Sequence, residues 1–186
     1  LIYKDQLNDP YLAVRAFDEA LDDDPKFLKA FQAIDDLLDE TRDTARRDRY
    51  YRKMLIRAVN HDLDPNLIAE LALQIGHLNL IRLNQIEEAQ RAYDLVLNYR
   101  PMDEEGHRGS IAVRRKLFGL DAATEHAFQW VRRIPTSTDA YRALYRCTAE
   151  AGHLDWAWCV ASALQVLNSS TEESDQFFQE GLSYVG

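Results

Sequence analysis

The chain has 186 residues, of which 46% are hydrophobic, 7 are Gly and 5 are Pro, and its formal net charge is -9. Such a composition suffices for a packed core and is too poor in turn formers for an all-β fold, so we expect a mostly helical chain. The negative charge disfavours binding to nucleic acid or anionic lipid, and no apolar run approaches the ~20 residues that span a bilayer.

Apolar residues at helical spacing predict helices along nearly the whole chain. Asp9-Pro10 and Asp64-Pro65 mark two starts, because each aspartate can cap a helix whose first position is proline. Gly152 suits the left-handed residue that ends a helix. After a partial helix at residues 1–7, the predicted helices cover about 10–22, 26–40, 43–60, 65–82, 86–98, 103–117, 121–133, 138–151 and 154–167.

A repeat of 34 residues runs through these helices. Ala89, Ala123 and Ala157 follow one another at this spacing. The step from Arg47 to Ala89 is 42 residues, so one unit carries eight extra residues near residues 60–80. A single helical hairpin would leave one apolar face exposed to solvent, and stacked repeats bury that face.

The second helix of two units combines a small residue, an aromatic residue one turn later, a small or apolar residue and a closing proline. The two stretches are Ala13-Phe17-Ala20-Pro25 and Ala89-Tyr93-Val96-Pro101. This pattern resembles the tetratricopeptide repeat. The family's first-helix signature is matched in kind by Tyr141, Leu144, Tyr145 and Gly152, and poorly by His107, Ser110 and Ile111. Related helical-hairpin repeats are the alternative.

The resemblance implies an all-α fold, a right-handed α-solenoid of about five helical hairpins in one repeat domain. The units would cover about 1–25, 26–64, 65–101, 102–135 and 136–169. A capping helix over 170–186 is expected, because Ser170 and Glu173 form a capping box ahead of an apolar stripe of Phe177, Phe178 and Leu182. The first unit lacks most of its leading helix, which predicts a fragment of a longer array.

No residues are spaced as a catalytic, cofactor or metal site, so we expect no enzyme and no cofactor. The five histidines show no HxxxH or HExxH spacing, and neither a Gly-rich phosphate loop nor a nucleophile elbow occurs. Cys147 and His153 offer two ligands where structural zinc takes four. Cys147 and Cys159 are interpreted as free, buried thiols.

One predicted helix carries a basic stripe at steps of three and four, formed by Arg42, Arg46, Arg49, Lys53 and Arg57. Its opposite face, Tyr51, Met54, Leu55 and Ala58, is expected in the core. The stripe could dock an acidic partner or phosphate. The favoured interpretation is mutual screening by acidic residues of the two preceding helices, namely Asp18, Asp22, Asp23, Asp35, Asp36, Asp39 and Glu40.

A second basic set lies on predicted first helices, which line the concave groove in the resembled family. Its members are Arg82, Arg108, Arg115, Lys116, Arg142 and Arg146. Guanidinium groups hold carboxylates by paired hydrogen bonds, so this groove suits an acidic peptide or a C-terminal carboxylate. The asparagines that complete the chaperone-tail clamp of some family members are missing, so that function does not carry over. The competing interpretation is solvated arginines paired with Glu104, Glu105 or Glu150.

The aromatic residues of the last two units are expected in the core rather than on a stacking surface. They are Tyr141, Tyr145, Trp130, Trp156 and Trp158.

The sequence therefore predicts a non-catalytic scaffold that binds an acidic or extended segment of a partner protein. The alternative is a structural or assembly role, either as a spacer or as a surface for homo-oligomers. Nucleic-acid binding ranks third, because the net charge opposes it. Partner identity and compartment do not follow from the sequence.

Overall fold

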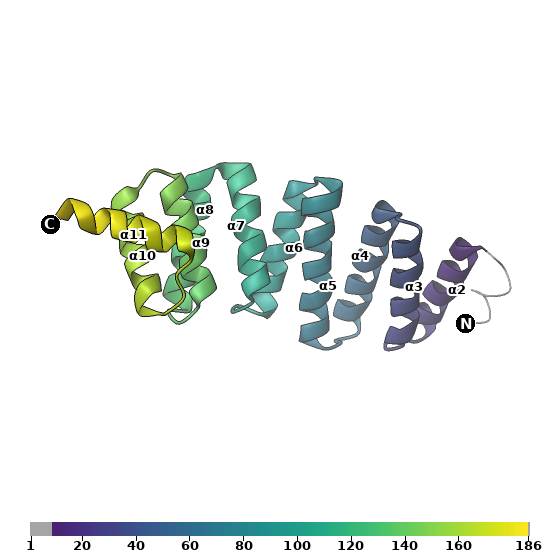
Figure 1. The fold of residues 1–186 in the computed structure, drawn as a ribbon. Coiled ribbons are helices and arrows are strands. Elements are labelled where there is room, and N and C mark those ends of the chain that lie inside the picture. Colours follow the sequence, from purple (N-terminus) through teal and green to yellow (C-terminus); the bar gives the residue numbers. More distant parts are fainter. Residues whose placement is uncertain (1–8, 186) are drawn as a thin grey trace. The chain divides into compact units, whose positions relative to one another are not determined.

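The computed structural model describes residues 9–185, with side chains up to residue 181. These residues form ten α-helices and one π-helical segment, without a strand, which confirms the all-α prediction (Figure 1). The chain divides into unit 1, Leu1–Arg100, and unit 2, Pro101–Gly186. The predicted partial helix at residues 1–7 lies outside the described residues. Within residues 9–185 every helix is too short or too polar to cross a membrane.

Unit 1 is a run of helices in which each packs against the next. Asp9 and Asp64 cap two of them as predicted, since their side chains accept hydrogen bonds from the backbone N–H groups of Tyr11 and Asn66, both at 2.9 Å. The elements are α2 (Pro10–Asp23), α3 (Leu28–Glu40), α4 (Thr44–Asn60), α5 (Pro65–His77), the π-helical segment η1 (Leu78–Leu83) and α6 (Ile86–Tyr99).

Small and large buried residues alternate in the core of unit 1. Ala13 and Ala58 are fully buried and let neighbouring helices approach, while Leu21, Ile34 and Met54 fill the space between them. The predicted core face of α4 is confirmed, because Tyr51, Met54 and Ala58 are buried and Leu55 packs against them partly buried.

The unit with extra residues has longer helices. Helix α4 has 17 residues where α2, α6 and α8 have 14, and α5 continues into η1. The sequence predicted one α-helix over 65–82, whereas residues 78–83 are π-helical. The buried Asn79 side chain donates to the Ile75 carbonyl at 2.8 Å, which is the acceptor that an α-helix gives to the Asn79 backbone. Competition for this acceptor favours the wider turn.

A glycine sets the approach of α6 to α5. A Cβ atom on Gly76 would lie 2.8 Å from the ring of the buried Tyr93. The missing side chain therefore makes room for the aromatic residue that belongs to the repeat pattern.

Unit 2 has the same kind of hairpins. Asp103 and Ser137 cap two helices by accepting from the backbone N–H groups of Gly106 at 2.7 Å and Ala140 at 3.3 Å. Gly152 has a φ of 73° after the helix end, as predicted. The elements are α7 (Glu104–Phe118), α8 (Leu120–Arg133), α9 (Thr138–Glu150), α10 (Leu154–Val166) and α11 (Glu172–Val185). Besides its neighbours in the chain, α9 contacts α7.

The expected capping helix is present as α11, but its capping box was predicted one residue too early. Thr171 Oγ1 accepts from the Ser174 backbone N–H at 3.3 Å, and Ser174 Oγ accepts from the Thr171 N–H at 2.9 Å. The side chain that accepts from the backbone N–H of the capping residue is therefore Ser174, where we expected Glu173.

Two aromatic contacts hold α11 against α9 and α10. Phe177 meets Tyr145 at 6.0 Å between ring centroids, and Phe178 stacks on Trp158 at 5.4 Å. The side chain of Leu182, the third residue of the predicted stripe, lies outside the described part. A Cβ atom on Gly181 would lie 2.3 Å from the Trp158 indole, so the glycine permits this close contact.

We expect Ala157→Leu to lower the free energy of unfolding by about 1–3 kcal/mol, because extra methylenes at a close helix contact cause overpacking. Ala157 is fully buried, as its place in the repeat required. Urea denaturation followed by circular dichroism measures the change, and Ala163→Leu on the same helix, at a half-buried position, is the control. Equal midpoints for Ala157→Leu and the wild type would contradict the prediction.

Candidate functional site

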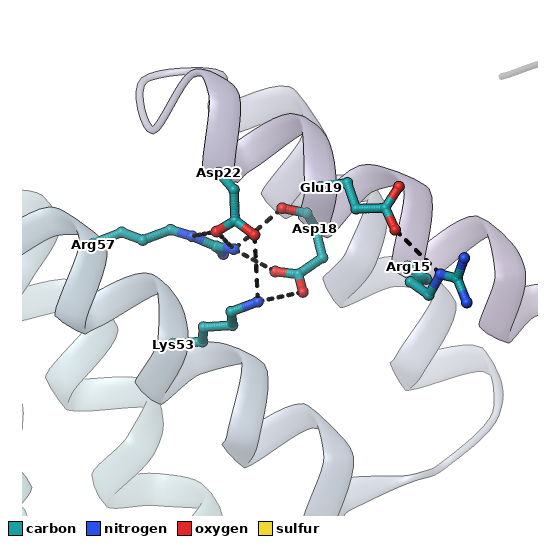
Figure 2. A network of polar contacts seen from close by, with 6 residues as sticks. All are labelled: Arg15, Asp18, Glu19, Asp22, Lys53 and Arg57. Carbon is teal, nitrogen blue, oxygen red and sulfur yellow. Dashed lines mark hydrogen bonds and ion pairs between the residues drawn. The ribbon is translucent and has the colours of Figure 1, made fainter.

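Two residues of the basic stripe, Lys53 and Arg57, are neutralised by carboxylates of α2 within unit 1 (Figure 2). Lys53 Nζ lies 2.6 Å from Asp18 Oδ2 and 3.7 Å from Asp22 Oδ2. Arg57 Nη2 donates to Asp18 Oδ1 at 2.6 Å, to the Asp18 carbonyl at 3.1 Å and also to Asp22. The favoured interpretation of mutual screening is therefore confirmed for Lys53 and Arg57.

Two positions of the stripe differ from the prediction. Arg42 lies in the turn before α4 with a φ of 55°, so it is not on the helix. Arg57 is only 7% exposed rather than on a solvated face, because the carboxylates of α2 cover it. The hydrogen bond from Arg57 holds the pKa of Asp22 below its ordinary value.

Arg47, which the stripe omitted, forms the tie between α4 and α3. Its guanidinium donates to Asp35 at 2.6 and 2.9 Å and to Asp39 at 2.5 Å. The hydrogen bond to Asp35 raises the pKa of Arg47 against its desolvation. Burial, together with the negative charge of Asp35, raises the pKa of Tyr51 to about 12.

The predicted groove residues on α7 connect to acidic residues of α9. Arg108 Nη1 lies 3.0 Å from Asp139 Oδ2, and its Nη2 lies 3.9 Å from Glu105. Arg115 donates to Glu150. These pairs link the first helices of two successive hairpins, and all four partners keep part of their surface in water.

Arg142 and Arg146 on α9 differ in how firmly they are held. Arg142 donates to the Ser169 carbonyl at 3.1 Å and lies 3.4 Å from Asp139. The exposed Arg146 contacts the Arg142 carbonyl at 3.4 Å, and no carboxylate of the described residues pairs with it. Both arginines line a hollow of about 610 Å³, together with Tyr145, Leu164, Thr171, Glu172, Glu173 and Gln176.

The remaining predicted groove residues are exposed. Lys116 lies in the last turn of α7. Arg82 lies in η1, where it lines a separate hollow of unit 1. The structure therefore gathers Arg142 and Arg146 at one hollow, ties Arg108 and Arg115 to carboxylates, and has Arg82 in the other unit.

A histidine pair in unit 2, formed by the buried His107 and the half-buried His126, was missed, because 19 residues separate its members in the sequence. His107 Nε2 lies 3.0 Å from the Pro101 carbonyl, which can only accept, so Nε2 carries the hydrogen. His107 Nδ1 then accepts from His126 Nε2 at 3.2 Å. No three His, Cys, Asp or Glu side chains of the described residues gather as a metal site.

We expect this histidine pair to make unit 2 less stable in mild acid. Burial lowers the pKa of His126 from 6.5 to about 4, helped by Arg114, His107 and Arg133. Burial also lowers the pKa of His107, and the positive charge of Arg133 lowers it further. The hydrogen bond to the Pro101 carbonyl and the negative charge of Asp103 raise the pKa of His107 and offset part of this effect. Between pH 4 and pH 6.5 the unfolded state binds more protons than the folded state does. The stability contributed by the neutral histidines is therefore present above pH 6.5 and is lost as the pH falls toward 4.

The expected loss from His126 between pH 7 and pH 5 is about 1–2 kcal/mol of unfolding free energy. Denaturant titrations at both values measure it in the wild type and in His126→Gln, which keeps a donor and cannot titrate. The exposed His61 provides the control variant His61→Gln. A pH slope in His126→Gln that is as steep as in the wild type would contradict the prediction.

Two of the residues expected in the core are at the surface. Trp130 and Tyr145 are buried and Tyr141 and Trp158 are half-buried, but Trp156 is 57% exposed because it faces outward from α10 beside Phe128, 6.3 Å away. Cys147 is buried as expected, and burial raises the pKa of its thiol. Cys159 is exposed, two residues beyond the buried Ala157 on α10.

Solved structures with this arrangement of helices are similar to most of the chain. BtubC from P. vanneervenii aligns over 98% of this chain and 88% of its own, at 15% identity and a TM-score of 0.60. YrrB, described as a TPR protein with an unusual peptide-binding site, aligns over 92% and 84%, at 17% identity and 0.60. A tetratricopeptide repeat protein from Parabacteroides merdae aligns over 96% and 67%, at 12% identity and 0.60.

The chain has a tetratricopeptide-repeat fold. No protein-family model and no curated protein matches its sequence. In the repeat register predicted from the sequence, α3, α5, α7 and α9 would be first helices, and α2, α4, α6, α8 and α10 would be second helices. In that register the predicted groove residues lie on first helices or on η1, which continues α5.

Proposed function

We propose that this chain is a non-catalytic scaffold that binds an acidic, extended segment of a partner protein along its first helices. The observation that carries the proposal is the hollow between α9 and α11, where the unpaired Arg146 lies beside Arg142. A guanidinium group without a carboxylate partner is available to a ligand carboxylate. The peptide-binding site named for YrrB, which shares this fold, agrees with such a use.

The groove arginines contribute unequally to this proposed site. A ligand at Arg108 or Arg115 has to displace Asp139 or Glu150, and exposed ion pairs of this kind are weak enough to exchange. Arg142 holds the Ser169 carbonyl in the turn before α11, so its first role is to position the hollow. Arg146 is therefore the residue whose charge a ligand meets first, and Lys116 is a further cation on α7.

Titration of poly-glutamate by calorimetry tests the proposal. We expect Arg146→Glu to weaken binding about tenfold or more, since a charge-assisted hydrogen bond contributes about 1.5–3 kcal/mol. Binding should weaken further with salt, which screens exposed charges over about 8–10 Å. The matched control is Arg132→Glu on α8, where Arg132 is also exposed. Equal affinities for wild type and Arg146→Glu, or equal losses in both variants, would contradict a site at α9.

A second candidate is assembly, favoured by one apolar surface on the second helices α8 and α10. Phe128, Leu154 and Trp156 are 38%, 58% and 57% exposed, and the two aromatic rings are neighbours. A second copy of this chain could pack the same patch against it in a two-fold interface. Sedimentation equilibrium of the wild type and Trp156→Ser distinguishes this role, because only the wild type would form a concentration-dependent dimer.

A further inference from the structure

Unit 1 contains a polar hollow that the scaffold proposal does not use. It has a volume of about 380 Å³ and lies where the end of α3, the turn into α4 and the segment η1 meet. Three of its lining residues are arginines. The lining consists of Asp39, Arg42, Thr44, Arg47, Leu78 and Arg82.

One of these arginines is already balanced. Arg47 uses Nε, Nη1 and Nη2 to donate to Asp35 and Asp39. Its side chain is about a quarter exposed, and the Asp35 side chain is 14% exposed. Asp35 therefore holds Arg47 in place, and Asp39, whose side chain is 71% exposed, offsets part of its charge at the hollow.

The other two arginines are exposed cations. No carboxylate of the described residues pairs with Arg42 or with Arg82. The turn places Arg42 at the hollow with a φ of 55°, and its backbone N–H donates to the Asp39 carbonyl at 3.0 Å. Arg82 lies in the last turn of η1, which ends at the left-handed Asn84. The Thr44 hydroxyl adds a neutral donor at the same hollow.

We propose that this hollow binds the phosphate group of a phosphorylated serine or threonine in a partner segment. A phosphate monoester carries a charge of about −1.5 to −2 at pH 7 and three acceptor oxygens. Two unpaired guanidinium groups and one hydroxyl match this charge and number of acceptors. A carboxylate carries one charge and two oxygens, so it would neutralise the two arginines less completely than a phosphate monoester does. The inference concerns unit 1 alone and does not rest on the site proposed at α9.

The test uses the whole chain and the peptide acetyl-Gly-Gly-phosphoserine-Gly-Gly-amide. Titration followed by the arginine Nε–Hε signals in nitrogen-15 NMR should give saturable shifts for Arg42 and Arg82. The same peptide with serine should not bind, and the peptide with glutamate should bind at least about tenfold more weakly. Equal affinities of the phosphoserine and glutamate peptides would overturn the assignment of phosphate. Inorganic phosphate is titrated as well, and saturation by free phosphate without binding of the phosphopeptide would overturn the assignment to a partner segment.

Single substitutions identify the arginines that bind the phosphopeptide. Arg42→Gln and Arg82→Gln should each weaken the phosphopeptide about tenfold or more, with an unchanged circular dichroism spectrum. Arg49→Gln removes an arginine of α4 that is also exposed and does not line the hollow, and it should leave the affinity unchanged. Arg146→Glu should also leave it unchanged, which separates this site from the one at α9. Losses of equal size in Arg49→Gln and Arg82→Gln would overturn the proposal, as would binding that neither Arg42→Gln nor Arg82→Gln weakens.

Discussion

Trp130→Ala is expected to lower the free energy of unfolding by about 3–5 kcal/mol, because it removes the largest fully buried side chain of the described residues and leaves a cavity. The indole packs among the helices of unit 2 and stacks on His107 at 4.9 Å between ring centroids. Urea denaturation followed by circular dichroism measures the loss.

Trp130→Phe is the matched control for this prediction. The indole Nε1 has no hydrogen-bond partner in the described part of the chain, so phenylalanine gives up volume without breaking a hydrogen bond. We expect a clearly smaller loss than in Trp130→Ala. If both variants unfold at the wild-type midpoint, Trp130 does not support the core of unit 2.

Arg57→Ala is expected to destabilise unit 1 by about 2–4 kcal/mol, because it leaves the buried carboxylate of Asp18 with fewer partners. Asp18 is 8% exposed, and after the substitution Lys53 alone of the two cations of α4 remains beside it. Denaturant unfolding at pH 7 measures the effect.

The control for Arg57→Ala is Arg15→Ala, whose partner Glu19 lies on the same helix (Figure 2). Their side chains are 73% and 67% exposed at 3.2 Å, so the loss should stay below about 1 kcal/mol. Similar losses in the two variants would mean that burial adds nothing to the Arg57 network. At acid pH the network should weaken as well. Arg57 lowers the pKa of Asp22, so that contribution is present above pH 3.8 and is lost as the pH falls through the folded pKa.

Repeat spacing was a reliable guide to the helices because it reports on packing. Ala89, Ala123 and Ala157 are fully buried, at places where a larger side chain would separate two helices. Local spacing could not predict η1, because the Asn79 side chain that donates to the Ile75 carbonyl is also held by Asp48, 31 residues earlier, at 2.6 Å. It also could not distinguish the exposed Trp156 from the half-buried Trp158, since both lie on one apolar helix.

In the candidate sites, too, helical spacing predicted some contacts and missed others. Arg57, Lys53 and their acidic partners were predicted, because their charges recur at helical spacing on neighbouring helices. Asp139 was missed as a partner of Arg108, and so was the pairing of His107 with His126, because both contacts join helices through side-chain directions that spacing does not contain. The binding of an acidic segment at the hollow between α9 and α11 and the binding of phosphate at the polar hollow of unit 1 are proposals.

The difference in exposure between the two cysteines allows selective labelling of the chain beside α11. Cys159 is exposed at a hollow of about 450 Å³ that α10 shares with α11, whereas Cys147 is buried with a raised thiol pKa. Because thiolate is the reactive form, a maleimide dye should attach to Cys159 first. The dye would then lie beside Trp158 and Phe177, where quenching by the indole reports whether the terminal helix is docked or has come away.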